Sequence, residues 1–272
     1  DVTRQLLACG ADIVEMNTIR KRLSAVKGGR FARLCVPARV FSVVLSDVIG
    51  DPLDMIASGP AYPDSSTCGQ AMDIVKKYGL NFPESVLSLL REETPKKLDN
   101  VETHITGSVR QLCASAASVC KRLGYEPRFL TAALQCEARE AGGFLASIAR
   151  DHQEEGHSIA YLCGGETVVH LTGHGKGGRN QEIALSGAAG ISGLSDTALF
   201  SVGSDGTDGP TDAAGGYADG ETRRKLLDAG IQIDRVLAEN DAYTALSACG
   251  GLIITGPTGT NVNDLTVLLI KR

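Results

Sequence analysis

Ile159-Ala-Tyr-Leu-Cys-Gly-Gly-Glu-Thr-Val-Val-His-Leu171 predicts two short strands, Ile159–Leu162 and Thr167–Leu171, on either side of Gly164-Gly-Glu166. A glycine-rich polar loop follows, Gly173-His-Gly-Lys-Gly-Gly-Arg-Asn-Gln-Glu182, and Gln181–Ala189 is expected to be helical. Strand, loop and helix in direct succession are typical of an α/β fold.

The same alternation extends along the rest of the chain. Val40–Leu45 is almost continuously apolar, a pattern typical of strands covered on both faces. Asn17 or Thr18 is expected to cap a helix that ends at Gly28, and Thr67 one that reaches Tyr78. Further strands are expected near His104–Ile105, Arg128–Leu134, Ala198–Val202, Leu252–Ile254 and Leu265–Ile270, with helices at 83–92, 110–123, 137–153 and 222–248.

Residues 93–100 form the expected interdomain linker, because they are polar, contain Pro95 and show no apolar period. A chain of 272 residues with 43% apolar residues is also long for a single core. We therefore expect two α/β domains, at residues 1–95 and 101–272.

Composition excludes several classes of protein. A formal charge of −5 argues against a nucleic-acid partner, and no apolar run approaches the length of a membrane span. Eight cysteines without a C-x-x-C spacing indicate reduced, packed thiols and a reducing compartment such as the cytoplasm. The first residue is Asp1, so a processed or excised chain is also expected.

Three glycine-rich loops in the last third carry the chemistry-bearing residues. They are Gly173–Glu182, Ser204-Asp-Gly-Thr-Asp-Gly-Pro-Thr-Asp212 and Thr255-Gly-Pro-Thr-Gly-Thr-Asn-Val-Asn-Asp264. Glycine allows backbone N–H groups to approach a ligand, and the polar side chains can bind phosphate and metal. Together the loops predict a phosphoryl-transfer site.

The first loop admits three interpretations. Gly173, Gly175 and Gly178 fit G-x-G-x-x-G between a predicted strand and helix, which is the layout of a dinucleotide-binding turn. Arg179 at the start of the helix instead suits a phosphate oxygen. A glycine-rich hairpin with a solvated arginine is the third interpretation.

The second loop holds Asp205, Asp208 and Asp212 among turn-forming glycines and a proline. Clustered carboxylates suit Mg²⁺, although Asx-turns would use the same residues. The third loop offers hydroxyls and amides for a sugar-acid hydroxyl or a phosphate. Glu166 is a candidate acid, base or metal partner, or one half of a cross-strand salt bridge.

The N-terminal third also places polar residues on expected loops. Asn17, Lys27, Asp47 and the pair Ser58-Gly59 share this character. Lys27 could reach an anionic substrate, but a lysine at the end of a helix is equally well explained by the helix dipole.

Taken together, eight segments resemble the glycerate 2-kinase family with the MOFRL domain, whose members are sometimes labelled hydroxypyruvate reductase. They follow the family order over essentially the whole chain: Glu15–Arg20, Leu23–Gly29, Leu45-Ser-Asp-Val-Ile-Gly-Asp51, Ile56–Pro60, Gly164–Thr167, Gly177–Glu182, Gly206–Gly215 and Thr255–Asp264.

The resemblance implies a Rossmann-like N-terminal domain, here truncated, and a MOFRL domain with a mixed sheet at about 158–270. It implies transfer of the γ-phosphoryl of ATP to the 2-hydroxyl of D-glycerate with Mg²⁺. The family has a further N-terminal stretch with a Gly-Lys-Ala motif that this sequence lacks, so the activity of this chain alone stays open.

Loops and resemblance together give the candidate site. Arg179, Asp205, Asp208 and Lys27 are the expected catalytic residues, and Asp205 and Asp208 are also the expected Mg²⁺ ligands. The expected substrate or nucleotide contacts are Asn17, Asp47, Ser58, Gly59, Glu166, Gly177, Gly178, Asn180, Glu182, Thr207, Thr258, Thr260 and Asn261.

Two other functions stay open. One is an NAD(P)-dependent hydroxypyruvate reductase that uses Gly173–Gly178 as its cofactor turn. The other is a non-catalytic fragment that binds a phosphorylated ligand or self-associates, for instance as a homodimer.

Overall fold

A computed structural model describes residues 1–50 and 52–272; Asp51, the last residue of the motif that begins at Leu45, lies outside them. The chain forms two compact units. The first unit holds residues 1–44 and 52–106. The second unit holds Leu45–Gly50 and Gly107–Arg272. The segment expected as a linker therefore belongs to the first unit, where Thr94 is buried and its hydroxyl donates to Asp64 Oδ2 at 2.7 Å.

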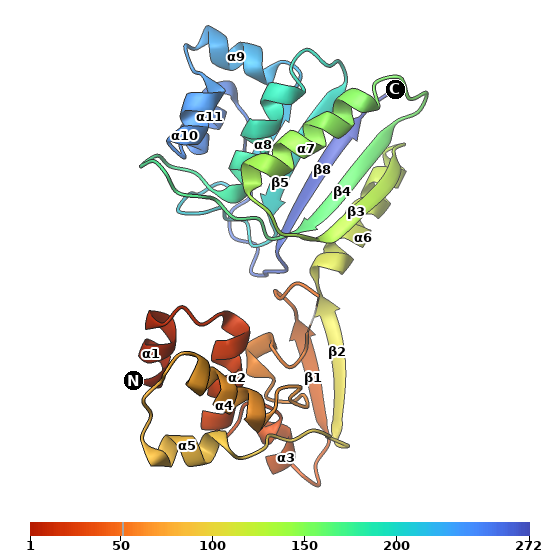
Figure 1. Cartoon of the computed structure of the whole chain (residues 1–272). Helices are drawn as coiled ribbons and strands as arrows, with labels where there is room; N and C mark the ends of the chain where they lie inside the picture. The colour runs from red at the N-terminus through yellow and green to blue at the C-terminus, as the bar shows by residue number, and fades with distance from the viewer. Residues whose placement is uncertain (51) are drawn as a thin grey trace. The chain divides into compact units, whose positions relative to one another are not determined.

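The first unit combines helices with a two-stranded sheet (Figure 1). Its apolar core lies between the helices and includes Leu6, Ile19, Ala71 and Leu90. The elements are α1 (Val2–Ala8), α2 (Ile13–Leu23), α3 (Arg30–Leu34), β1 (Val40–Leu45), η1 (Ile56–Ser58), α4 (Cys68–Lys77), α5 (Glu84–Leu90) and β2 (Val101–Gly107).

Capping explains where its two longer helices begin. Asp12 and Glu15 form a capping box that starts α2, so the expected cap at Asn17 or Thr18 is wrong: both lie inside the helix and are buried. Thr67 and Gln70 form a second capping box at the start of α4, as expected for Thr67. Consequently Asn17 points into the unit rather than satisfying a helix end.

Strand β1 is not covered on both faces by the described residues, contrary to the expectation. The side chains of Phe41 and Val43 are 63% and 70% exposed. Strand β1 pairs with β2 alone in a two-stranded sheet, so an apolar run does not by itself guarantee a second covering layer.

The second unit is built on a six-stranded mixed sheet with the order β3-β4-β8-β5-β6-β7. Only β3 and β4 pair in parallel, and every other neighbouring pair is antiparallel. The elements are α6 (Val109–Arg122), β3 (Glu126–Leu134), α7 (Ala138–Asp151), β4 (Ile159–Gly165), α8 (Arg179–Gly190), β5 (Thr197–Gly203), β6 (Gly215–Asp219), α9 (Thr222–Asp228), α10 (Ile233–Ala238), α11 (Ala242–Cys249), β7 (Leu252–Ile253) and β8 (Asp264–Ile270).

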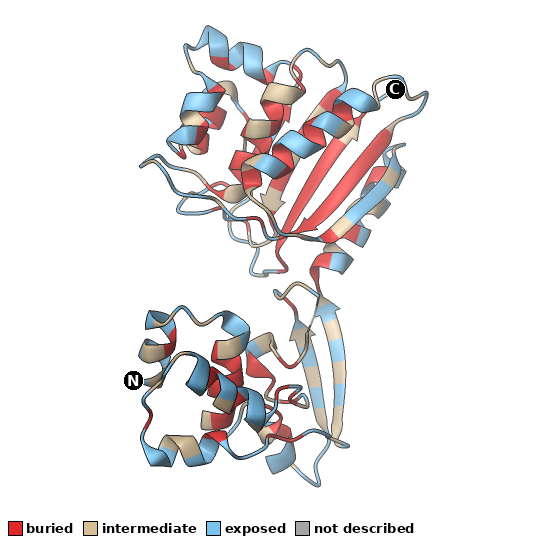
Figure 2. Ribbon diagram, in the orientation of Figure 1, coloured by how far each residue is buried: buried red, intermediate tan, exposed pale blue. Residues whose placement is uncertain are grey.

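Helices cover both faces of this sheet. Helices α7 and α8 pack on one face with Ile159, Leu199 and Leu268, whereas α6 packs on the other with Leu162 and Val267 (Figure 1). The central strands β4 and β8 are buried along almost their whole length (Figure 2). The mixed α/β architecture expected from the sequence is confirmed.

Two strand predictions fail in this unit. Residues 167–171 are irregular apart from one bridge between Val168 and Glu137, although their composition favours a strand. Strand β6 was not expected, because Gly215-Gly216 lowers its strand propensity; small residues are needed there since a Cβ on Gly215 would lie 1.9 Å from Ser201 O. Among the described residues, no helix combines the length and the apolar character needed to cross a bilayer.

Candidate functional site

The three glycine-rich loops meet at one end of the second unit's sheet. The loop before α8 contacts the loop that ends at the start of β8 through Arg179 and Asp264. The backbone N–H of Thr258 donates to Asp205 O at 3.0 Å, and the Thr258 hydroxyl donates to Ser204 O. Segments up to 85 residues apart in the chain are therefore joined in one polar cluster.

Arg179 lies at the centre of this cluster. Its Nε and Nη2 donate to Asp264 Oδ2 and Oδ1 at 2.5 and 3.1 Å, and its Nη1 lies 3.1 Å from Glu166 Oε1. The bond to Asp264 is the main reason that the pKa of Arg179 is raised. Its side chain remains 34% exposed, so the guanidinium is both fixed in orientation and accessible.

A cavity of about 770 Å³ opens beside Arg179. Val168, Val169, Leu171 and Pro210 supply apolar wall, which is typical of small-molecule sites with a few polar groups. Five of the expected site residues line it: Glu166, Gly177, Gly178, Arg179 and Glu182.

Asp208 has a role that the sequence did not indicate. Its carboxylate accepts from the backbone N–H groups of Asn180 and Gln181 at 3.1 and 2.8 Å, so it caps the N-terminus of α8 from another loop. Gly178 is the N-cap residue and cannot cap by itself. A Cβ at Gly178 would lie 2.3 Å from Asp208 Cγ, so glycine is required for this close approach.

This arrangement changes the expected metal ligands. Both Asp208 oxygens are engaged by α8, and the residue is buried. Asp205 is half-buried, and its Oδ1 accepts from Thr207 N at 2.9 Å. Within residues 1–50 and 52–272 no cluster of three or more histidine, cysteine or acidic side chains is arranged to hold a metal ion.

Asn180 and Glu182, both in the first turn of α8, have different surroundings. Asn180 is fully buried, its amide bonded to Asp208 and to Ser201, so it supports the loop and does not face the cavity. Glu182 lines the cavity while being almost entirely buried. Burial raises its pKa, and Arg139, at 3.3 Å, only partly opposes that shift.

The remaining expected contact residues of the second and third loops lie at or near the surface. Thr207, Thr258 and Asn261 are exposed and Thr260 is half-buried. Asn261 Oδ1 accepts from Asn263 N, and the Thr258 hydroxyl is bonded within the loops. Their side chains shape the bends that carry Asp205 and Asp264.

The glycines that suggested a dinucleotide turn pack against protein instead. A Cβ at Gly173 would lie 2.3 Å from Glu239 Cα, and one at Gly175 would lie 2.3 Å from Asp241 Cβ. Asn240 Oδ1 accepts from Gly173 N at 2.9 Å. In the described structure, residues 169–178 contain no strand, so no strand leads directly into this turn as it does in a dinucleotide site.

A second polar group forms within the first unit. Ser58 Oγ donates to Asn17 Oδ1 at 3.1 Å and accepts from Lys27 Nζ at 3.3 Å. Helix α2 ends at Leu23, so Lys27 is not the helix-end lysine of the alternative interpretation. Asp47 is exposed and belongs to the segment 45–50, which groups with the second unit rather than with these residues.

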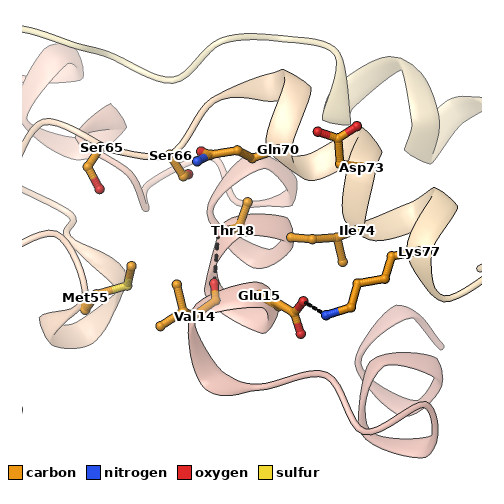
Figure 3. Close-up of a pocket in the computed structure, with 10 residues that line it drawn as sticks. All are labelled: Val14, Glu15, Thr18, Met55, Ser65, Ser66, Gln70, Asp73, Ile74 and Lys77. Carbon is orange, nitrogen blue, oxygen red and sulfur yellow. Dashed lines mark hydrogen bonds and ion pairs between the residues drawn. The ribbon is translucent and has the colours of Figure 1, made fainter.

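The first unit also holds a cavity of about 430 Å³ between α2 and α4 (Figure 3). Its main charged groups neutralise each other, since Lys77 Nζ lies 2.6 Å from Glu15 Oε1. Thr18 donates to Val14 O, and Ser65 donates to Asp54. Because Glu15, Lys77, Thr18 and Ser65 are bonded within the protein and Asp73 is acidic, this cavity offers less to an anionic ligand than the one beside Arg179.

Sequence reasoning missed three functional or supporting residues. Asp264 was noted only as part of the third loop, although its position at the start of β8 signals a fixed carboxylate. Asn240 and the buried Lys21 gave no local signal, because their partners lie about 67 and 33 to 43 residues away.

Two family models match the chain. The Domain of unknown function (DUF4147) matches residues 1–91, and the MOFRL family matches residues 159–264. The glycerate kinase of Macaca fascicularis is 35% identical over 99% of this chain and 82% of its own length. The chain belongs to the glycerate 2-kinase family with a MOFRL domain.

Another relative has a higher sequence identity. The D-glycerate 2-kinase of Thermotoga maritima is 52% identical over 99% of this chain and 66% of its own length. The crystal structure of glycerate kinase from the same organism superimposes with a TM-score of 0.95, again over 99% of this chain and 66% of that one. The chain thus spans about two thirds of the length of these relatives.

Proposed function

We propose that this chain serves an ATP-dependent glycerate 2-kinase, which transfers the γ-phosphoryl group to the 2-hydroxyl of D-glycerate. The observation that carries the proposal is Arg179, fixed by Asp264 and open to a cavity of about 770 Å³. Membership of a family whose relatives bear the name glycerate kinase supports the same reaction.

Phosphoryl transfer depends on positioning and on charge neutralisation more than on covalent chemistry. In the proposed mechanism the guanidinium of Arg179 neutralises charge that builds on the transferred group. Asp264 occupies Nε and Nη2, while Glu166 is 47% exposed and can be displaced from Nη1 by a phosphate oxygen. The guanidinium group of Arg179 is therefore oriented before the ligand binds.

The proposed metal is Mg²⁺, which usually takes one or two protein carboxylates and completes its shell with phosphate oxygens and waters. Asp205 fits the part of such a ligand, because no described residue is bonded to its second oxygen. Asp208 does not fit, since α8 engages both of its oxygens. When bound, the ion would offset the negative charge of the nucleotide phosphates.

All eight cysteines are free. Persistent free thiols, including the buried Cys113 and Cys163, are typical of a reducing compartment. We accordingly propose the cytoplasm as the site of action.

The test is ADP release with D-glycerate and ATP–Mg²⁺, measured on the complete gene product and on this chain. Silence of the complete product with glycerate and with related hydroxy acids would overturn the proposal. Oxidation of NADH with hydroxypyruvate would instead support the reductase. A thermal shift with ATP–Mg²⁺ but no turnover would support a non-catalytic binding protein.

A further inference from the structure

Three consecutive residues of the first unit have left-handed backbone angles: Ala57, Ser58 and Gly59, with φ of 51°, 61° and 59°. Only glycine adopts this region without a penalty, so Ala57 and Ser58 are strained. Strain of this kind persists only where the surroundings enforce it, and it concentrates at functional sites.

Contacts from two directions hold this turn in place. Gly28 N donates to Ser58 O at 3.0 Å, and Gly29 N donates to Gly59 O at 2.7 Å. A Cβ on Gly59 would lie 2.9 Å from the backbone of Asp54, whose carboxylate is bound by the fully buried Lys21 at 3.0 Å. The buried ion pair thereby fixes the segment that leads into the turn.

The turn presents Ser58 Oγ between an acceptor, Asn17 Oδ1, and a donor, Lys27 Nζ. Asn17 and Ser58 are both more than nine-tenths buried. Because the Asn17 oxygen accepts from Ser58, the Asn17 amide nitrogen is directed elsewhere and remains available to an acceptor. Lys27 Nζ approaches the same hydroxyl from the other side.

Lys27 has no counter-ion among the described residues. No carboxylate of those residues lies within 4.0 Å of its Nζ, whereas Lys21, Arg22 and Lys96 each have at least one. A cation held by a buried hydroxyl and left without a counter-ion suits an anionic ligand.

We propose that Lys27 Nζ and the Asn17 amide, organised by Ser58, bind an oxyanion of the ligand. Two sources have this chemistry: the carboxylate of the hydroxy acid and a phosphate of the nucleotide. Naming these sources rests on the proposed kinase function, whereas the oxyanion site itself rests only on the geometry of the first unit.

The first experiment measures binding of D-glycerate alone and of ADP alone to the complete gene product by titration calorimetry. Lys27→Met should weaken one of the two by about tenfold or more, because a charge-assisted hydrogen bond is lost. Lys27→Arg should restore part of the affinity. Lys76→Met, at an exposed position near the end of α4, should change neither.

The outcomes separate this site from the kinase proposal. A fall in glycerate affinity assigns the site to the carboxylate, and a fall in ADP affinity assigns it to a phosphate. Unchanged binding of both ligands by Lys27→Met would overturn the site even if ADP is released normally. Binding that depends on Lys27, without ADP release by the complete gene product, would support the oxyanion site and contradict the proposed kinase function.

A second pair of variants tests whether the strain serves binding. Ser58→Gly removes the hydroxyl and relieves the left-handed backbone, so affinity should fall while the Tm stays equal or rises. Ala57→Gly relieves strain without touching a ligand group, so the Tm should behave in the same way with affinity unchanged. An unchanged affinity in Ser58→Gly would contradict the role of the turn.

Discussion

Two cations in different units of this protein are fixed by carboxylates, yet they have different surroundings. Lys21 in the first unit is fully buried and lies 3.0 and 3.1 Å from Asp54 and Asp64. Arg179 in the second unit also contacts two carboxylates, but its side chain is 34% exposed and lines a cavity. The difference is that Lys21 is completely paired inside the protein, whereas Arg179 is oriented by carboxylates and still accessible, which is why we propose Arg179 and not Lys21 as a ligand contact.

Carboxylates differ between the units in the same way. Burial alone would raise the pKa of Asp54 and Asp64, but hydrogen bonds, from Ser65 and Thr94 respectively among others, and Lys21 outweigh it and hold both pKa values below their usual range. In the second unit, burial prevails and raises the pKa of Asp208 and Glu182. The first unit therefore gains stability from ionised acids, and the second carries acids that resist ionisation.

The largest effect is expected when the buried charge of Lys21 is removed. Lys21→Met should destabilise the first unit by about 3–5 kcal/mol, because Asp54 and Asp64 would be left buried with too little positive charge. Urea unfolding measures the loss, with Lys76→Met as the control at an exposed lysine. A loss below about 1 kcal/mol would mean that the buried pair is not essential to this unit.

Next in size is removal of the accessible charge. Arg179→Ala should lower turnover by about 10²- to 10³-fold, as expected when a preorganised donor to the developing charge is lost. ADP release measures the change, and Arg224→Ala on the exposed face of α9 is the control.

This variant also leaves Asp264 unpaired, so stability needs its own comparison. The double variant Arg179→Ala, Asp264→Asn should regain stability without regaining turnover. Recovery of turnover in the double variant would show that Arg179 has a structural role, as Lys21 does.

A smaller effect is expected at the cap of α8. Asp208→Ala should cost about 1–2 kcal/mol through the loss of a helix cap. The Mg²⁺ concentration required for half-maximal ADP release should stay unchanged, because the Asp208 oxygens bind α8. Thermal unfolding and a Mg²⁺ titration test the two parts, and a raised Mg²⁺ requirement would restore Asp208 as a metal ligand.

The smallest expected effect is a difference between the two units in how their stability depends on pH. Burial alone would raise the pKa of Glu93 above its usual 4.5, but hydrogen bonds from the Cys68 backbone N–H, from the Cys68 side chain and from Lys96 together lower it to about 2. Its stabilisation, like that of Asp54 and Asp64, is present above the unfolded pKa and is lost as the pH falls through the folded one. Asp208 and Glu182 have raised pKa values, so their protonation favours the folded second unit as the pH falls.

Lowering the pH from about 5 to about 2, through the window between the unfolded and the folded pKa of Glu93, should therefore destabilise the first unit relative to the second. Urea unfolding at each pH, followed by hydrogen-exchange pulses at one common pH, resolves the two units. Equal shifts in both units, or a larger loss in the second, would contradict the assignment of the two classes of carboxylate.

Local signals predicted much of the fold. Apolar runs located β1, β4, β5 and β8, and Thr67 marked the start of α4 because a cap is a contact between residues three apart. Residues 167–171 were expected to be a strand and are not, since no neighbouring strand is available to pair along their length. Strand β6 was not predicted because Gly215-Gly216 has a low strand propensity. A glycine is required at Gly215 because its backbone lies close to Ser201 of β5, a contact that the local sequence does not indicate.

Sequence alone determined the α/β class and the three polar loops and singled out Arg179 as a candidate, because propensity, glycine spacing and side-chain chemistry are local properties. Tertiary structure alone decided the work of each acid: Asp264 orients Arg179, Asp208 caps α8, and Asp54 and Asp64 bind Lys21. The physical reason is that the role of a carboxylate depends on its burial and on the partner that the fold brings to it, and those partners lie about 27 to 85 residues away along the chain.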